Sequence, residues 1–236
     1  QWLETHFNAL GLTTSRVSLH ANYRGFNVLG FQTGTSRRDD WYVVGAHMDS
    51  RNQNWDDNSP SPGAEDNASG CSGVLEMAHV LSQYETEASI FYMCFIEEEK
   101  GLWGSKEVVT HFTDTGDISK VKAMLNMDMI SRSDKNELYV VGTRFYENLK
   151  PVISAAKLPE NFELLVGHDG SDDKQNWTNS SDHGSFHKKQ IPFLYFGVED
   201  HKDYHKETDE FESIHPEFYA KAVSVIISVF MDLDGS

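Results

Sequence analysis

Residues 41–49 read Trp-Tyr-Val-Val-Gly-Ala-His-Met-Asp, an apolar run that ends directly in polar side chains. A short, continuous apolar run of this kind is typical of a strand that is buried on both faces of a sheet. Further runs with this character lie at residues 89–96, 121–127 and 191–198. The sequence therefore predicts a sheet with several buried strands, each followed by polar residues.

Helical patterns separate these runs. Strands that alternate with helices predict an α/β fold, a three-layer sandwich in which helices flank a mixed, mainly parallel central sheet. We expect residues 1–236 to form a single domain, with Phe26–Gln32 and residues 41–46 pairing as a hairpin at the sheet edge across a polar turn at 33–40. Another strand is expected at residues 137–141, helices at 1–10, 70–84, 105–112, 145–157 and 216–233, and a long loop at 167–181.

The composition limits the partners of the chain. Its 236 residues include 37 acidic and 20 basic ones, for a net charge of −17, so we expect neither nucleic acid nor an anionic membrane as a partner. The chain opens on Gln1 inside an expected helix, which favours a processed or shortened chain that lacks an N-terminal segment. We expect a secreted or periplasmic monomer. Cys71 and Cys94 are either buried free thiols or a disulfide, which requires helix 70–84 to pack on strand 89–96.

Polar side chains follow the apolar runs at the point where each run ends. Because ligands of open α/β sheets bind outside the carboxyl ends of the strands, we expect these side chains to converge. They are His47 and Asp49, Glu97 to Glu99, Asp128, and Tyr204 with His205. A fifth segment, the small-residue loop at 63–70, sets Asp66 just before a helix; the alternative is that Asp66 or Ser69 caps that helix.

Two histidines and three carboxylates make a mixed nitrogen and oxygen ligand set. Zinc accepts such a set, whereas calcium and magnesium prefer oxygen alone. Five ligands exceed what one tetrahedral zinc with an open position uses, but a bridging carboxylate would give each of two metals three protein ligands. We therefore expect two Zn²⁺ ions per chain, with Co²⁺ or Mn²⁺ as possible substitutes.

The polar segments resemble those of the co-catalytic dizinc aminopeptidases, which are related to bacterial leucyl aminopeptidases and more distantly to glutamate carboxypeptidases and glutaminyl cyclases. The resemblance covers roughly residues 47–209 and implies a zinc exopeptidase fold. Its motifs, in chain order, are GAHMDS at 45–50, GAEDNASG at 63–70, EEKGLWGS at 98–105, NMDMI at 126–130, SDHGSF at 181–186, and Tyr204-His205 followed by Thr208-Asp209.

The resemblance also implies the ligands of each metal. His47 and Asp128 match the ligands of one zinc, Glu99 and His205 match those of the other, and Asp66 matches the bridging carboxylate.

The remaining site residues match supporting roles in the family. Asp49 matches the carboxylate that orients His47, and its spacing of two residues suits that contact. Glu98 matches the general base, and Tyr204 matches a donor to the developing oxyanion. Glu97 departs from the family, because a small or apolar residue usually stands there.

The resemblance implies an aminopeptidase that releases N-terminal, large apolar residues from peptides with a free N-terminus, using a metal-activated water. The alternatives are a glutaminyl cyclase with one zinc, a carboxypeptidase for acidic C-termini, and a non-catalytic interaction domain on the same fold. A carboxypeptidase would want a basic cluster, whereas Arg132, Arg144 and Lys174 are scattered in the sequence. A non-catalytic domain should have lost ligands, and none of the five is missing.

Overall fold

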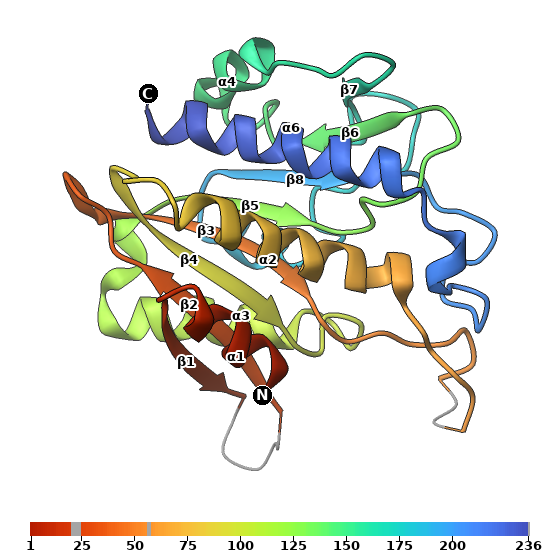
Figure 1. Cartoon of the computed structure of the whole chain (residues 1–236), viewed down its shortest axis with the longest axis horizontal. Helices are drawn as coiled ribbons and strands as arrows, with labels where there is room; N and C mark the ends of the chain where they lie inside the picture. Colours follow the sequence, from red (N-terminus) through yellow and green to blue (C-terminus); the bar gives the residue numbers. More distant parts are fainter. Residues whose placement is uncertain (20–24, 56–57, 236) are drawn as a thin grey trace.

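One sheet organises the computed structural model, which describes residues 1–19, 25–55 and 58–235. Within these residues the sheet has eight strands, in the order β1-β2-β4-β3-β5-β8-β6-β7 (Figure 1). The strands are β1 (Thr13–Ser18), β2 (Phe26–Gln32), β3 (Arg37–His47), β4 (Ala88–Phe95), β5 (Val121–Met127), β6 (Glu137–Val141), β7 (Glu163–Val166) and β8 (Phe193–Gly197). The central strands β4, β3, β5 and β8 are parallel, whereas β2 and β6 join them antiparallel.

The central strands are apolar on both faces. In β4, Ile90 and Tyr92 pack into one hydrophobic cluster and Met93 and Phe95 into the other, and all four are fully buried. Alternate side chains of a strand point to opposite faces, so a strand covered on both sides needs apolar residues at every position. The prediction of a buried strand at this place is confirmed.

Helices cover the two faces of the sheet. One cluster contains residues of α1 (Trp2–Ala9), α2 (Gly70–Leu81), α4 (Lys150–Ala155) and α6 (Pro216–Asp234). The other contains residues of α3 (Trp103–Thr115) and α5 (His183–His187). In Figure 1, α2 and α6 lie in front of the sheet. The predicted three-layer α/β sandwich with a mixed, mainly parallel sheet is confirmed.

The predicted hairpin of β2 and β3 is wrong. β4 lies between these strands, with Val28 opposite Cys94 in the antiparallel pair and Val43 opposite Phe91 in the parallel pair. The predicted turn at 33–40 is also too long, since β3 already begins at Arg37. Distant acidic residues hold this end of β3, because the Arg37 guanidinium binds Glu87 at 3.1 Å and also the Asp234 side chain.

Several other elements differ from the sequence-based prediction. The edge strands β1 and β7 and the short helix α5 were not predicted, and the helix expected at 145–157 is only η3 (Glu147–Leu149) followed by α4. Helix α2 packs against β4, yet Cys71 and Cys94 are free thiols in the described part of the chain.

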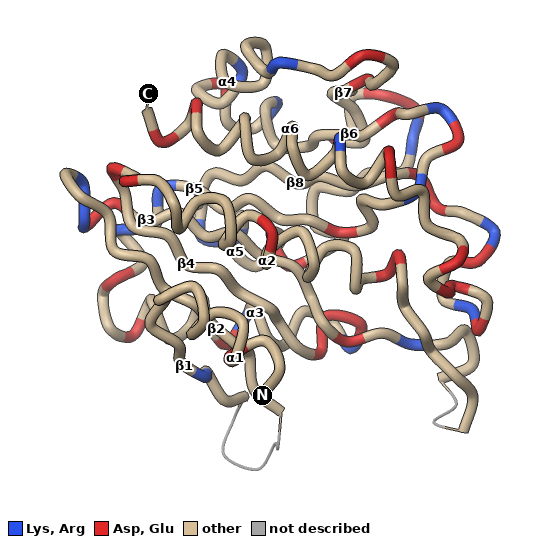
Figure 2. Tube along the Cα trace, in the orientation of Figure 1, with Lys and Arg blue, Asp and Glu red and all other residues tan. Residues whose placement is uncertain are grey.

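The surface is consistent with the acidic composition. Acidic positions, red in Figure 2, are spread over loops and helices around the molecule, with fewer basic positions among them. Among the described residues, every helix is too short or too polar to cross a lipid bilayer.

Candidate metal centre

The carboxyl ends of the four central strands bring the predicted ligands together. His47 is the last residue of β3, Glu99 follows β4, Asp128 follows β5, and His205 lies in the loop after β8. Because these strands are parallel and adjacent, their ends meet at one edge of the sheet. Asp66 comes to the same place from η1 (Ala64–Ser69), which precedes α2.

Asp66 lies between two histidine and carboxylate pairs. Its Oδ1 is 3.3 Å from His47 Nε2, which is also 3.2 Å from Asp128 Oδ1. Its Oδ2 is 2.9 Å from His205 Nε2, which is also 3.3 Å from Glu99 Oε1. We call His47, Asp66 and Asp128 the first triad, and Asp66, Glu99 and His205 the second triad. Within the described residues, these are the groups whose ligand atoms lie within 4.8 Å of one another.

The donor atoms of the triads fit a metal cation. Glu99 Oε1 and His205 Nε2 are buried, and neither forms a hydrogen bond with the described residues. Burial disfavours a charged imidazole, but the carboxylates of Asp66 and Glu99 beside it outweigh this and raise the pKa of His205 to about 9. Three carboxylates around two imidazoles thus attract positive charge strongly. Buried, unpartnered nitrogen and oxygen donors of this kind suit Zn²⁺.

Segment η1 holds Asp66 away from the cap of the following helix. The side chains of Asp66 and Ser69 do not cap α2; instead Ser69 donates to the carbonyl of Glu65 at 2.7 Å. The Asn67 amide donates to the carbonyl of Met127 at 3.0 Å, which ties η1 to the end of β5. The peptide bond between Asp66 and Asn67 is cis. The alternative role of Asp66 as a helix cap is therefore wrong.

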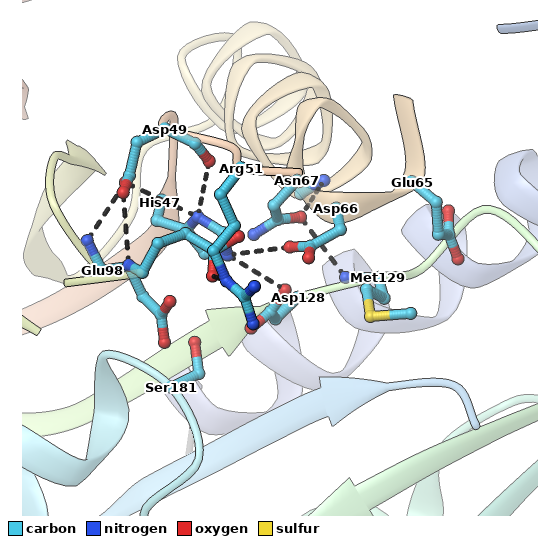
Figure 3. Close-up of polar contacts among 12 residues, drawn as sticks. His47, Asp49, Arg51, Glu65, Asp66, Asn67, Glu98, Asp128, Met129 and Ser181 are labelled. Carbon is cyan, nitrogen blue, oxygen red and sulfur yellow. Dashed lines mark hydrogen bonds and ion pairs between the residues drawn. The ribbon is translucent and has the colours of Figure 1, made fainter. Parts of the chain in front are cut away.

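Asp49 connects two of the loops that carry ligands. Its carboxylate accepts the backbone N–H groups of Glu98 at 3.1 Å and of Glu99 at 3.2 Å (Figure 3). His47 Nδ1 lies 3.0 Å from the backbone carbonyl of Asp49 and 3.7 Å from its carboxylate. Burial raises the pKa of Asp49, but the nearby His47 imidazole and the hydrogen bonds that these N–H groups donate lower it overall, so the carboxylate stays ionised. Asp49 therefore lies where it can fix both the imidazole and the turn that carries Glu98 and Glu99.

Glu98 and Tyr204 line the same pocket as the triad residues His47, Asp66, Glu99 and Asp128. Burial raises the pKa of Glu98 to about 10 in the metal-free site, and the charges of Asp128, Asp182 and Glu99 add to this effect. Cations in the triads would offset those carboxylates and lower the pKa again. Burial also raises the pKa of Tyr204, so its hydroxyl keeps its proton and can donate it in a hydrogen bond.

Glu97, the residue that departs from the family pattern, belongs to neither triad. Its Oε2 is 2.9 Å from Lys100 Nζ. Its negative charge is therefore balanced by a lysine of the same turn.

Two buried acidic residues that sequence reasoning gave no role tie the remaining loops together. Asp209 accepts the backbone N–H groups of Glu65 and Asp66, each at 3.1 Å. Glu65 is fully buried and accepts the N–H groups of Ser131 and Arg132 at 3.0 Å, just after Asp128. Their sequence signal was their place in two motifs, Glu65 in GAEDNASG at 63–70 and Asp209 in the last motif. The contacts themselves join residues too distant in sequence to be predicted.

Comparisons with known proteins agree on one family. The model of "Peptidase family M28" matches residues 27–230. A protein called "Probable zinc metalloprotease" from Pyrenophora teres f. teres is 31% identical over 61% of this chain and 31% of its own length. "Leucine aminopeptidase 2" from Trichophyton rubrum is 28% identical over 80% of this chain and 37% of its own length. The chain thus spans about a third of the length of these curated relatives.

A solved structure extends the likeness to the fold. The crystal structure of BSAP, a zinc aminopeptidase from Bacillus subtilis, is 27% identical and has a TM-score of 0.71 over 90% of this chain and 51% of its own. The sheet and its helical layers are therefore similar to those of a zinc aminopeptidase.

Proposed function

This chain belongs to peptidase family M28, and from that premise we propose that it is a zinc-dependent aminopeptidase with a dinuclear site. The observation that carries the proposal is the position of Asp66, which presents Oδ1 to His47 at 3.3 Å and Oδ2 to His205 at 2.9 Å. A carboxylate shared in this way would give each of two metals three protein ligands. His47 and Asp128 would hold one zinc, and Glu99 and His205 the other.

The residues around the triads can carry out hydrolysis of a peptide bond. Zinc bound there would lower the pKa of a water molecule toward about 7 and polarise the scissile carbonyl. Glu98 accepts the proton of the attacking water and delivers it to the leaving amine. The Tyr204 hydroxyl donates a hydrogen bond to the oxygen that gains negative charge. The Asp49 carboxylate keeps Glu98 in place by accepting a hydrogen bond from the backbone N–H of Glu98.

The pocket also supports a substrate class. Met129, Trp177, Tyr195 and Val198 line it next to the triads, and they offer apolar or aromatic surface to the side chain of the N-terminal residue. The carboxylates of the triads favour the positive charge of a free N-terminal amine. Large apolar N-terminal residues are therefore the proposed substrates.

The carboxypeptidase alternative receives no support from the basic residues. Arg132 binds Asp203 at 2.7 Å, Arg144 lies 3.8 Å from Asp169, and Lys174 lies 3.2 Å from Glu199. Each of these cations already has an acidic partner, so they do not form a cluster that waits for the carboxylate of a substrate.

Hydrolysis of a panel of aminoacyl anilides tests the proposal. We expect turnover of the leucyl substrate, loss of turnover after chelation, and recovery on addition of zinc. An acetylated N-terminus should abolish cleavage, because the free amine is part of the recognition. Cyclisation of N-terminal glutamine without anilide hydrolysis would contradict the proposal and support a glutaminyl cyclase.

A further inference from the structure

The carboxylate of Glu99 is divided between two partners. Its Oε1 lies 3.3 Å from His205 Nε2, inside the second triad. Its Oε2 accepts a hydrogen bond from Arg51 Nε at 2.9 Å. A carboxylate can bind a metal through one oxygen or through both, and an arginine on one oxygen leaves the other as the ligand atom.

The Arg51 side chain is itself held in place. Its guanidinium carbon lies 4.6 Å from the centroid of the Trp55 ring, a distance at which a cation is attracted to the aromatic face. Only 23% of the Arg51 side chain and 8% of the Glu99 side chain are exposed, so water screens this ion pair less than a surface pair.

Within the described part of the chain, the first triad has no equivalent of this contact. Among the residues that the structure describes, no lysine or arginine forms an ion pair with Asp128, whose Oδ1 faces His47 Nε2 at 3.2 Å. The triads share Asp66 and each adds one histidine and one carboxylate, but among the described residues an arginine fixes only the carboxylate of the second triad. The two metal positions are therefore unequal.

We propose that Arg51 is a positioning residue that holds Glu99 as a one-oxygen ligand and so sets the zinc affinity of the second triad. The proposal rests on the dinuclear site of the proposed function. A partner that orients a metal ligand typically contributes 10–100-fold to metal affinity. Arg51 should raise the zinc affinity of the second triad and leave the zinc affinity of the first triad unchanged.

Zinc titration of the metal-free chain against a chromophoric chelator tests the proposal. The wild-type chain should bind two zinc ions in two steps. Arg51→Met should weaken one of the two zinc constants by about 10–100-fold and leave the other within about twofold. Arg51→Lys should recover little of the loss, because one ammonium cannot reproduce the directed Nε–H donor.

Arg16 provides the matched control. Its Nε donates to Glu4 Oε1 at 2.6 Å and its guanidinium carbon lies 4.1 Å from the Phe26 ring centroid, far from the triads in the β1 edge strand. Arg16→Met thus removes the same kind of contact and should leave both zinc constants unchanged. Circular dichroism of each metal-free variant checks that it is folded.

The possible results separate this inference from the proposed function. If the wild-type chain binds two zinc ions, three results for Arg51→Met would overturn the role of Arg51 and leave the dinuclear site standing. These are unchanged zinc constants, tighter constants, or two constants that are weakened equally. Full recovery by Arg51→Lys would also overturn it, since charge would then suffice. A wild-type chain that binds fewer than two zinc ions would overturn the dinuclear site and this inference with it.

Discussion

The carboxylate of Asp209 accepts the backbone N–H of Asp66 at 3.1 Å across 143 residues of sequence. Asp209 is 2% exposed and lies four residues after His205, so it ties the loop of one proposed ligand to the carboxylate that lies between the triads. The spacing of the ligands is thus set by hydrogen bonds that buried acids accept from backbone N–H groups, as well as by the strand ends.

Asp209→Asn should destabilise the fold and weaken zinc binding. Asparagine keeps one acceptor oxygen but turns an NH₂ group toward a backbone N–H that then lacks an acceptor. We expect the free energy of unfolding of the metal-free chain to fall by about 1–3 kcal/mol and zinc affinity to fall about 10–100-fold. Urea unfolding and zinc titration measure these changes. Asp134→Asn, at a side chain that is 97% exposed, is the control; equal effects of the two variants would contradict the role of Asp209.

Glu98→Gln should retain both zinc ions and lose turnover. The amide cannot accept the proton of the attacking water, so kcat should fall about 10²–10⁴-fold. Steady-state kinetics with a leucyl anilide, together with metal analysis, measure this change. The neighbouring Glu97→Gln, at a residue paired with Lys100, should keep kcat within a few-fold. A Glu98→Gln chain that hydrolyses at the wild-type rate would rule out Glu98 as the base.

Tyr204→Phe should lower kcat more than it raises KM. The ring stacks on His205 with centroids 3.7 Å apart, and phenylalanine keeps that contact while it removes the hydroxyl. Loss of one donor to a developing oxyanion typically costs about 10²–10³ in kcat. An unchanged kcat, or a loss confined to KM, would exclude the hydroxyl from the transition state.

His183 predicts a specific acid sensitivity of the fold. Burial lowers the pKa of His183 to about 3, and its Nε2 lies 2.9 Å from the carbonyl oxygen of Trp177. His183 binds a proton more readily in the unfolded state than in the folded state. The contribution of the neutral His183 to the stability of the fold is therefore complete above about pH 6.5 and is lost as the pH falls toward 3. The free energy of unfolding of the metal-free chain, measured with urea, should fall less between pH 7 and pH 4.5 for His183→Leu than for wild type. The same substitution at exposed His79 on α2 is the control. Parallel curves of unfolding free energy against pH for wild type and His183→Leu would contradict the prediction.

The sequence predicted the strands of the sheet centre well because their burial leaves a local signal. A strand such as β4 is apolar at successive positions, and an abrupt change to Glu97 and Glu98 marks its end. The triads could be expected for the same reason, since parallel strands end at one edge. The edge strand β1 could not be predicted, because most of its side chains are exposed and carry no apolar periodicity.

The order of the strands and the support of the site depend on contacts between distant residues. β4 lies between β2 and β3 because it pairs with residues distant in sequence, such as Cys94 with Val28. The local sequence shows only the short polar connection between β2 and β3, which suggests a hairpin. Likewise, the contact of Arg51 with Glu99 joins residues 48 positions apart. Such contacts leave no mark in the local pattern.

The number of zinc ions bound per chain tests the central claim most directly. Metal analysis of the wild-type chain, after loading with zinc and dialysis against metal-free buffer, should give two zinc ions per chain. We expect two because Asp66 places one oxygen beside His47, which also contacts Asp128, and the other beside His205, which also contacts Glu99. A value of one or none would contradict the dinuclear site.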